Sequence, residues 1–139
     1  MTEAHRHFHD DLSQVKIRLL TMSGEAEAAL GLAVEAWLER DGRKAQAVVS
    51  GDRVIDRMEV ELEEMCINLL ALQQPMARDL RMLTSALKIA NDLERVGDHA
   101  VNIAQSAQRL ADQRAIAPEP EIIEMARLAR DMLSDALEA

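Results

Sequence analysis

Apolar side chains recur every three or four residues along three long stretches of this sequence. The stretches cover residues 4–40, about 43–73 and 76–112. In the first of them the series begins at Phe8 and ends at Trp37. This spacing places the apolar side chains on one face of an α-helix, whereas a strand would need strict alternation, which no segment shows. The sequence therefore predicts an all-α fold of long helices.

Turn-forming residues separate these stretches. Asp41-Gly42 ends the first stretch, and Pro75 opens the third in a position suited to the first turn of a helix. Short connections of this kind make neighbouring helices antiparallel. A pair of prolines then brackets a short acidic segment before a fourth apolar stripe. We expect an antiparallel three-helix bundle over residues 4–112, a linker over 113–120 and a fourth helix over 121–139.

Composition narrows the function classes. The chain carries 16 basic and 25 acidic residues, which gives a net charge of −9 at pH 7. Binding to nucleic acid or to an anionic membrane surface needs a basic surface, and no basic run occurs. With one Phe, one Trp and no Tyr, the core must be filled by Ala, Leu and Met. The one cysteine, Cys66, lies on an apolar helix face and is expected to be a small buried hydrophobe.

The sequence shows no targeting or membrane-spanning segment. Its N-terminus has no apolar region of the signal-peptide type, and no run of about 18 apolar residues occurs. We therefore expect a cytoplasmic location without membrane insertion. A strongly acidic surface remains compatible with cations and with basic patches on other proteins.

Two acids, Glu94 and Asp98, lie four residues apart in the third predicted helix. Their carboxylates share one face at the edge of the apolar stripe, and Asn91 and Asn102 extend the row of oxygens. Like charges at this spacing destabilise a helix by roughly 0.2–0.5 kcal/mol. Oxygen ligands of this kind suit a hard or borderline cation. The alternative is a solvated acidic face on which Arg95 pairs with Asp98.

A second acidic row lies on the predicted helix over residues 43–73. It consists of acids at positions i, i+4, i+7 and i+11, which are Asp52, Asp56, Glu59 and Glu63. Apolar residues flank this row on both sides. A purely solvated face would not be expected in such a position.

The predicted hairpin brings the two acidic rows level. Because the chain turns near residues 74 and 75, residues whose numbers add to about 150 should face each other. Asp56 then lies level with Glu94, and Asp52 with Asp98. Four converging carboxylates would repel one another or acquire raised pKa values, so a bound divalent metal is the preferred interpretation. Solvated carboxylates, or carboxylates paired with Arg53, Arg57 or Arg95, are the open alternatives.

Two overlapping segments resemble the first repeat of the PhoU family of bacterial phosphate-signalling regulators. They read GDRVIDRMEVELEEMCINLLA and LLALQQPMARDLRMLTSALKIANDLERVGDHAVNIA, and the resemblance runs from about Phe8 to Ala104. Proteins of this family consist of two tandem three-helix bundles, each with a pair of E(D)xxxD motifs that bind metal ions. The resemblance implies that residues 121–139 are the first helix of an incomplete second repeat.

The resemblance also implies a set of metal ligands. The two motifs fall on Asp52 and Asp56 and on Glu94 and Asp98. Glu59 lies next on the same face and is expected as an additional ligand. Oxygen-rich sites of this kind accept magnesium, manganese, iron or zinc, so the identity of the metal stays open.

A regulatory, non-catalytic role is the function that the resemblance implies. Such proteins restrain the phosphate-starvation response and act between the ATPase of a Pst-type phosphate transporter and a PhoR-type sensor histidine kinase. They also tend to dimerise. We therefore expect these two partners for the present chain, together with homo-oligomers formed through the apolar stripe of the fourth helix.

Two other function classes compete with this reading. A metal-free helical adaptor would use the acids to bind a basic protein partner. A carboxylate-bridged di-metal enzyme would need Glu-x-x-His motifs on two helices, and no glutamate stands three residues before any of the four histidines. The sequence also lacks a glycine-rich phosphate loop and a nucleophile arrangement. We therefore expect no enzymatic activity.

Overall fold

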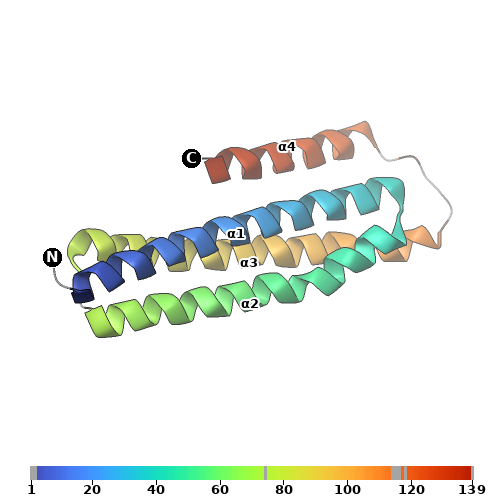
Figure 1. The fold of residues 1–139 in the computed structure, drawn as a ribbon. Coiled ribbons are helices and arrows are strands. Elements are labelled where there is room, and N and C mark those ends of the chain that lie inside the picture. Colours follow the sequence, from blue (N-terminus) through green and yellow to red (C-terminus); the bar gives the residue numbers. More distant parts are fainter. Residues whose placement is uncertain (1–2, 74, 114–116, 118, 139) are drawn as a thin grey trace.

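In the computed structural model, the described residues are 3–73, 75–113, 117 and 119–138. They form the helices α1 (Glu3–Glu39), α2 (Gly42–Gln73), α3 (Ala77–Ala111) and α4 (Pro120–Glu138), and they contain no strand. Helices α1, α2 and α3 lie side by side as an antiparallel bundle, and α4 lies along α1 (Figure 1). The predicted all-α fold, a three-helix bundle with a fourth helix, is confirmed. None of the helices found in these residues is long and apolar enough to cross a membrane.

Some predicted segments fall outside the described residues. They are residue 74 in the predicted hairpin turn, residues 114–116 and 118 of the predicted linker, and Ala139 of the predicted fourth helix. Elsewhere the helix ends differ from the predicted ones by no more than one residue. The assignment of α4 to a second repeat stays a prediction.

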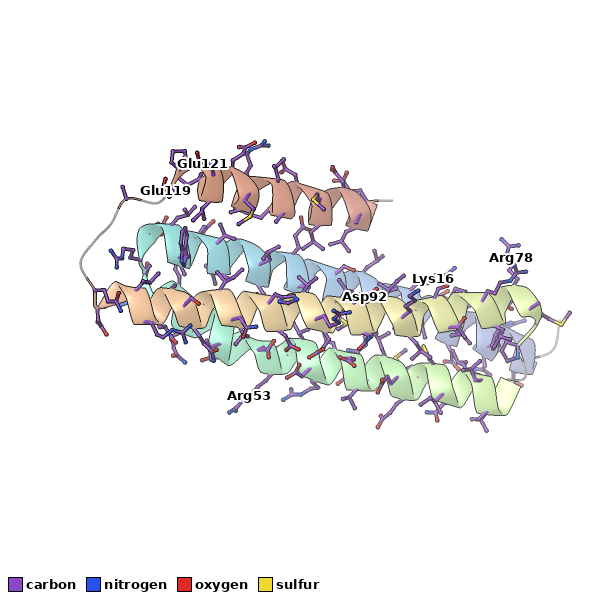
Figure 2. All side chains as sticks on the ribbon, turned by 180° about the vertical axis from the view of Figure 1, so that it is seen from behind. Lys16, Arg53, Arg78, Asp92, Glu119 and Glu121 are labelled. Atoms are coloured by element: carbon purple, nitrogen blue, oxygen red, sulfur yellow. The ribbon has the colours of Figure 1, made fainter. Side chains whose placement is uncertain are left out.

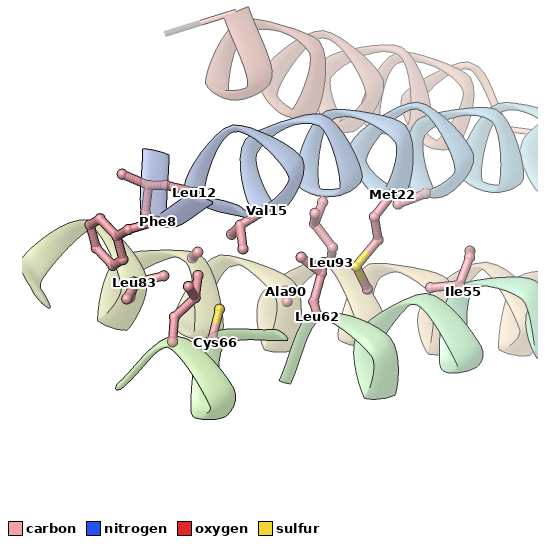
Figure 3. Close-up of a cluster of buried hydrophobic side chains, with 13 residues drawn as sticks. Phe8, Leu12, Val15, Met22, Ile55, Leu62, Cys66, Leu83, Ala90 and Leu93 are labelled. Carbon is pink, nitrogen blue, oxygen red and sulfur yellow. The ribbon is translucent and has the colours of Figure 1, made fainter. Parts of the chain in front are cut away.

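The main hydrophobic core lies between α1, α2 and α3. Its buried side chains include Phe8, Met22, Leu62 and Leu83 (Figure 3). Cys66 is buried among them, as predicted, and burial raises the pKa of its thiol. Methionine and leucine thus supply the volume that aromatic side chains supply in other cores.

Near the α1–α2 turn the core changes to small side chains. Its buried members there are Ala33, Ala36, Ala45, Val48, Ala100, Ala104 and Ala107. Because the distance between helix axes depends on the side chains at the contact, alanines permit a close approach. The candidate site lies where the two parts of the core meet, since Ile55 and Leu93 belong to the first part and Val48 and Ala100 to the second.

The turn between α1 and α2 is fixed by polar contacts. Arg40 adopts a left-handed backbone conformation with φ of 55°, and the Asp41 N–H donates to the Ala36 carbonyl at 2.9 Å, which closes the end of α1. The Asp41 carboxylate then accepts a hydrogen bond from the Arg43 N–H at 2.9 Å and caps α2. The Arg40 guanidinium also donates to the Leu110 carbonyl near the end of α3. The turn therefore holds one end of all three bundle helices together.

Helix α4 is the least buried element. None of its residues is buried, and α1 is the helix that it packs against. Leu137 packs against the main core, and the Arg130 guanidinium lies against α1 at Gly31. Large apolar side chains such as Met125 and Met132 stay exposed. The chain therefore packs its fourth helix onto its own bundle and leaves one apolar face of that helix uncovered; the predicted homo-oligomer stays a prediction.

The core predicts a large difference between two identical substitutions in α2. Leu62 is 1% exposed and Leu72 is 77% exposed. Leu62→Ala should lower the free energy of unfolding by about 2–5 kcal/mol, because it removes buried methyl groups and leaves a cavity. Leu72→Ala should change it by about 0.5 kcal/mol or less. Urea denaturation of both variants measures the difference, and equal losses would contradict the packing described above.

Candidate metal centre

The acidic side chains that were predicted as metal ligands lie along α2 and α3. They are Asp52, Asp56 and Glu59 on α2, and Glu94 and Asp98 on α3. The two helices are antiparallel and pack against each other. A Cβ atom placed on Gly97 would lie 3.2 Å from Oδ1 of Asp52. Asp52 is therefore level with the residue that precedes Asp98, as the predicted register requires.

Three of the five carboxylates converge. One oxygen each from Asp52, Asp56 and Asp98 lies within 4.8 Å of the other two. Oxygen ligands stand roughly 2.0–2.6 Å from Mg²⁺ or Ca²⁺, so two oxygens that share such a cation are at most about 4–5 Å apart. Asp52 is half-buried, whereas Asp56 and Asp98 are exposed. The spacing suits a shared cation, and the exposed side gives the cation access.

The Asp52 carboxylate is left without a hydrogen-bond donor. Its Oδ1 atom is buried, and it is the one buried side-chain oxygen or nitrogen in the described part of the chain that lacks a partner. Burial, followed by the charges of Asp56 and Asp98, raises the pKa of the Asp52 carboxyl. A buried oxygen without a donor is costly. A hard cation bound to the Asp52 carboxylate would offset this cost and cancel the repulsion, so the residues present fit such an ion.

Glu94 and Glu59 lie beside the three converging carboxylates. Burial is the first cause that raises the pKa of Glu94 to about 7, and the interaction with Asp98 and the charges of Glu59 and Asp56 add to it. Burial also raises the pKa of Glu59, with further contributions from Glu63, Asp56 and Asp98. Neither side chain belongs to the group whose oxygens converge. Both nevertheless feel the same concentration of negative charge.

The alternative of arginine-paired carboxylates is not seen among the described residues. Ion pairs there join Arg18 to Glu61, Lys44 to Glu35 and Glu39, and Arg127 to Glu124 and Asp131. None of these pairs involves the five acids of the candidate site. Figure 2 shows Arg53 projecting from α2 away from α3. The negative charge of the cluster is therefore not neutralised by a basic side chain in an ion pair.

Sequence reasoning gave no role to Gly97, which lies directly before Asp98 and is buried. The signal that could have marked it is a glycine inside an otherwise regular helical pattern. Such a glycine costs about 1 kcal/mol relative to alanine unless packing requires it. Here it faces Asp52 and Ile55 across the helix contact.

The fold and the cluster together define a class of all-α protein, in which a bundle of long antiparallel helices holds converging carboxylates between two of its members. Comparison with known proteins then identifies the family. The PhoU domain family matches residues 19–107 of this chain. The chain belongs to the PhoU domain family.

Relatives from several bacteria support this assignment. The chain is 37% identical over 127 residues to a protein of Aquifex aeolicus, and 38% identical over 133 residues to one of Clostridium acetobutylicum. Both are named phosphate-specific transport system accessory protein PhoU homolog. The alignments cover 91% and 95% of this chain but 58% and 61% of the relatives. The chain therefore spans about three-fifths of the length of these relatives.

Solved structures show the same fold. PhoU from Pseudomonas aeruginosa matches with a TM-score of 0.90 and 35% sequence identity, over 95% of this chain and 64% of that one. The phosphate transport system regulatory protein PhoU from Streptococcus pneumoniae matches with a TM-score of 0.85 and 29% identity, over 95% and 62%. The similarity includes α4 as well as the three-helix bundle, because it covers nearly the whole chain.

The raised pKa values predict an unusual pH dependence of stability. Lowering the pH from about 7.5 to about 5.5 should raise the melting temperature of the metal-free chain. Glu94 has a pKa of about 7 in the folded state against its ordinary value of 4.5, so the folded state binds its proton more tightly. The stabilisation by this proton is fully present below a pH of about 4.5 and is lost as the pH rises through about 7. Asp52 and Glu59 shift in the same direction.

Circular-dichroism melts of chelator-treated protein measure this effect, with Glu94→Gln as the comparison. The variant should melt at a higher temperature than the wild type at pH 7.5 and should depend less on pH, because its amide cannot ionise. Identical pH dependence in the two proteins would show that Glu94 has an ordinary pKa.

Proposed function

We propose that this chain is a metal-binding, non-catalytic regulator of phosphate transport. The single observation that carries the metal site is the convergence of three carboxylates, one of which, Asp52, also has a buried oxygen without a donor. The regulatory role is supported by membership of the PhoU domain family and by relatives named as accessory proteins of a phosphate-specific transport system. The chain spans about three-fifths of the length of those relatives, so the role of the whole relatives is proposed for this chain.

The proposed cation is divalent or trivalent and is held by Asp52, Asp56 and Asp98. Burial and then the charges of Asp56 and Asp98 raise the pKa values of Glu94 and Glu59, so both glutamates lie near the cation. They act as further ligands or as hydrogen-bond partners of bound water. The cation would supply charge neutralisation at the contact between α2 and α3. A ligand that binds only the folded arrangement stabilises it in proportion to its concentration over its dissociation constant. Occupancy would thereby fix the two helices in one arrangement.

The proposed partners are the ATPase of a Pst-type phosphate transporter and a PhoR-type sensor histidine kinase, on the cytoplasmic side of the membrane. In this role the protein restrains the phosphate-starvation response when phosphate is plentiful. Partner binding that prefers the metal-bound arrangement would depend on metal occupancy, by the reciprocity of linked equilibria. Asp56 and Asp98 are exposed and lie at the surface where a partner would detect the ion.

Elemental analysis tests the proposed metal site. Purified protein should contain stoichiometric metal that chelation removes, and added Mg²⁺, Mn²⁺ or Zn²⁺ should then raise the melting temperature. The double substitution Glu94→Gln with Asp98→Asn should abolish the metal content and the shift. It should leave the helical signal intact and should raise the metal-free melting temperature, because it removes repulsion.

A matched control removes two acids from solvent-exposed positions on the same two helices, Glu64→Gln with Asp92→Asn. This variant has the same net charge as the double substitution and should bind metal like the wild type. Absence of bound metal and of any melting shift at millimolar metal would refute the site. The acids would then be explained by a metal-free adaptor that binds a basic partner.

A separate experiment tests the regulatory role. In cells that encode this protein, replacing its gene with the Glu94→Gln, Asp98→Asn variant should switch on phosphate-starvation genes in phosphate-rich medium. A transcriptional reporter measures the response, and the Glu64→Gln, Asp92→Asn variant should leave it silent. Repression by the site variant that equals wild-type repression would separate regulation from metal binding.

A further inference from the structure

Gly97 occupies a position on α3 where an added side chain would be crowded by its neighbours. A Cβ atom there would lie 3.2 Å from Oδ1 of Asp52 and 3.3 and 3.4 Å from the Cδ1 and Cγ2 atoms of Ile55. Ile55 is 2% exposed and is held in the core, so it cannot readily move aside. Gly97 does not have a positive φ, so the backbone conformation does not require a glycine. What a glycine provides at this position is the space that a Cβ atom would otherwise occupy.

The other glycines of the chain do not have this environment. At Gly24, Gly42 and Gly51 nothing lies within 4 Å of an added Cβ. At Gly31 the nearest atom is the flexible end of the Arg130 side chain. Gly97 is therefore the glycine beside which a carboxylate of the candidate metal centre occupies the space that a side chain would need.

We propose that Gly97 is a positioning residue for the metal centre. By leaving space against α3, it lets the Asp52 carboxylate lie between the helices with one oxygen buried. In this position the carboxylate brings an oxygen within 4.8 Å of an oxygen of Asp56 and one of Asp98. A methyl group at position 97 displaces this carboxylate and disturbs the three-oxygen arrangement. The inference rests on the proposed metal site and adds a residue that carries no ligand atom itself.

The test compares Mn²⁺ affinity in the wild type and in Gly97→Ala. Electron paramagnetic resonance of free Mn²⁺ gives the bound fraction. Residues that orient metal ligands typically change affinity by about 10–100-fold, so Gly97→Ala should weaken Mn²⁺ binding at least about tenfold. Its helical signal should be unchanged, because alanine is a better helix former than glycine. Gly51→Ala, next to Asp52 but with open space around it, should bind Mn²⁺ like the wild type.

A double-mutant cycle with Asp52→Ala asks whether Gly97 acts through the Asp52 carboxylate. Once Asp52 is replaced by alanine, Gly97→Ala should cause no further loss of Mn²⁺ affinity, because the carboxylate that it displaces is gone. Equal fold losses in the two backgrounds would overturn the proposal. So would wild-type affinity in Gly97→Ala.

A third variant separates the carboxylate from general crowding and guards against misfolding. Gly97→Ala with Ile55→Val removes the Cδ1 atom that a new methyl would meet, while the contact with Asp52 remains. Binding should stay weak in this variant, and restored affinity would assign the effect to Ile55 and overturn the proposal. A wild-type protein that binds no Mn²⁺, Mg²⁺ or Zn²⁺ would instead refute the metal site itself, so the two failures are distinguishable.

Discussion

The packing of α2 against α3 is the interaction on which both the fold and the candidate site depend. Burial of Ile55, Leu62 and Leu93 drives this contact, with about 1.5–3 kcal/mol for each large side chain removed from water. The same contact brings Asp52 level with Asp98. Repulsion between partly exposed carboxylates costs less free energy than the burial of several large apolar side chains contributes. The bundle therefore forms with its acids held close together, and burial and mutual repulsion raise the pKa values of Asp52, Glu59 and Glu94.

The regular part of this arrangement could be predicted from the sequence. Long helices are rigid rods with a fixed rise per residue, so one turn near Pro75 sets the level of every residue along the hairpin. That is why the pairing of Asp52 with Asp98 could be inferred from numbers alone. The helix ends followed from the same periodicity and from few turn residues. The left-handed residue at the first turn is Arg40, and its side chain also reaches α3.

Other parts of the site depend on packing that a helical wheel does not contain. The wheel treats Asp52 and Asp56 alike, yet Asp52 is half-buried because it lies against Gly97, whereas Asp56 is exposed. Glu94 and Glu59 share the acidic faces but miss the group whose oxygens converge, since their longer side chains reach positions that depend on rotamer. Nothing in the sequence pointed to a role for Gly97, because the side chains that it contacts, Asp52 and Ile55, lie on the opposite helix.

Three features that lower stability meet at one level of the bundle. They are a buried Asp52 oxygen without a donor, neighbouring carboxylates that repel it, and a glycine inside a helix. Proteins tolerate such departures from local stability where function requires them. On the proposed function, a bound cation offsets the first two, and at 100 times its dissociation constant it stabilises the folded chain by about 2.7 kcal/mol. Gly97 then leaves the space in which the Asp52 carboxylate lies between α2 and α3, so that one cation can bind ligands from both helices.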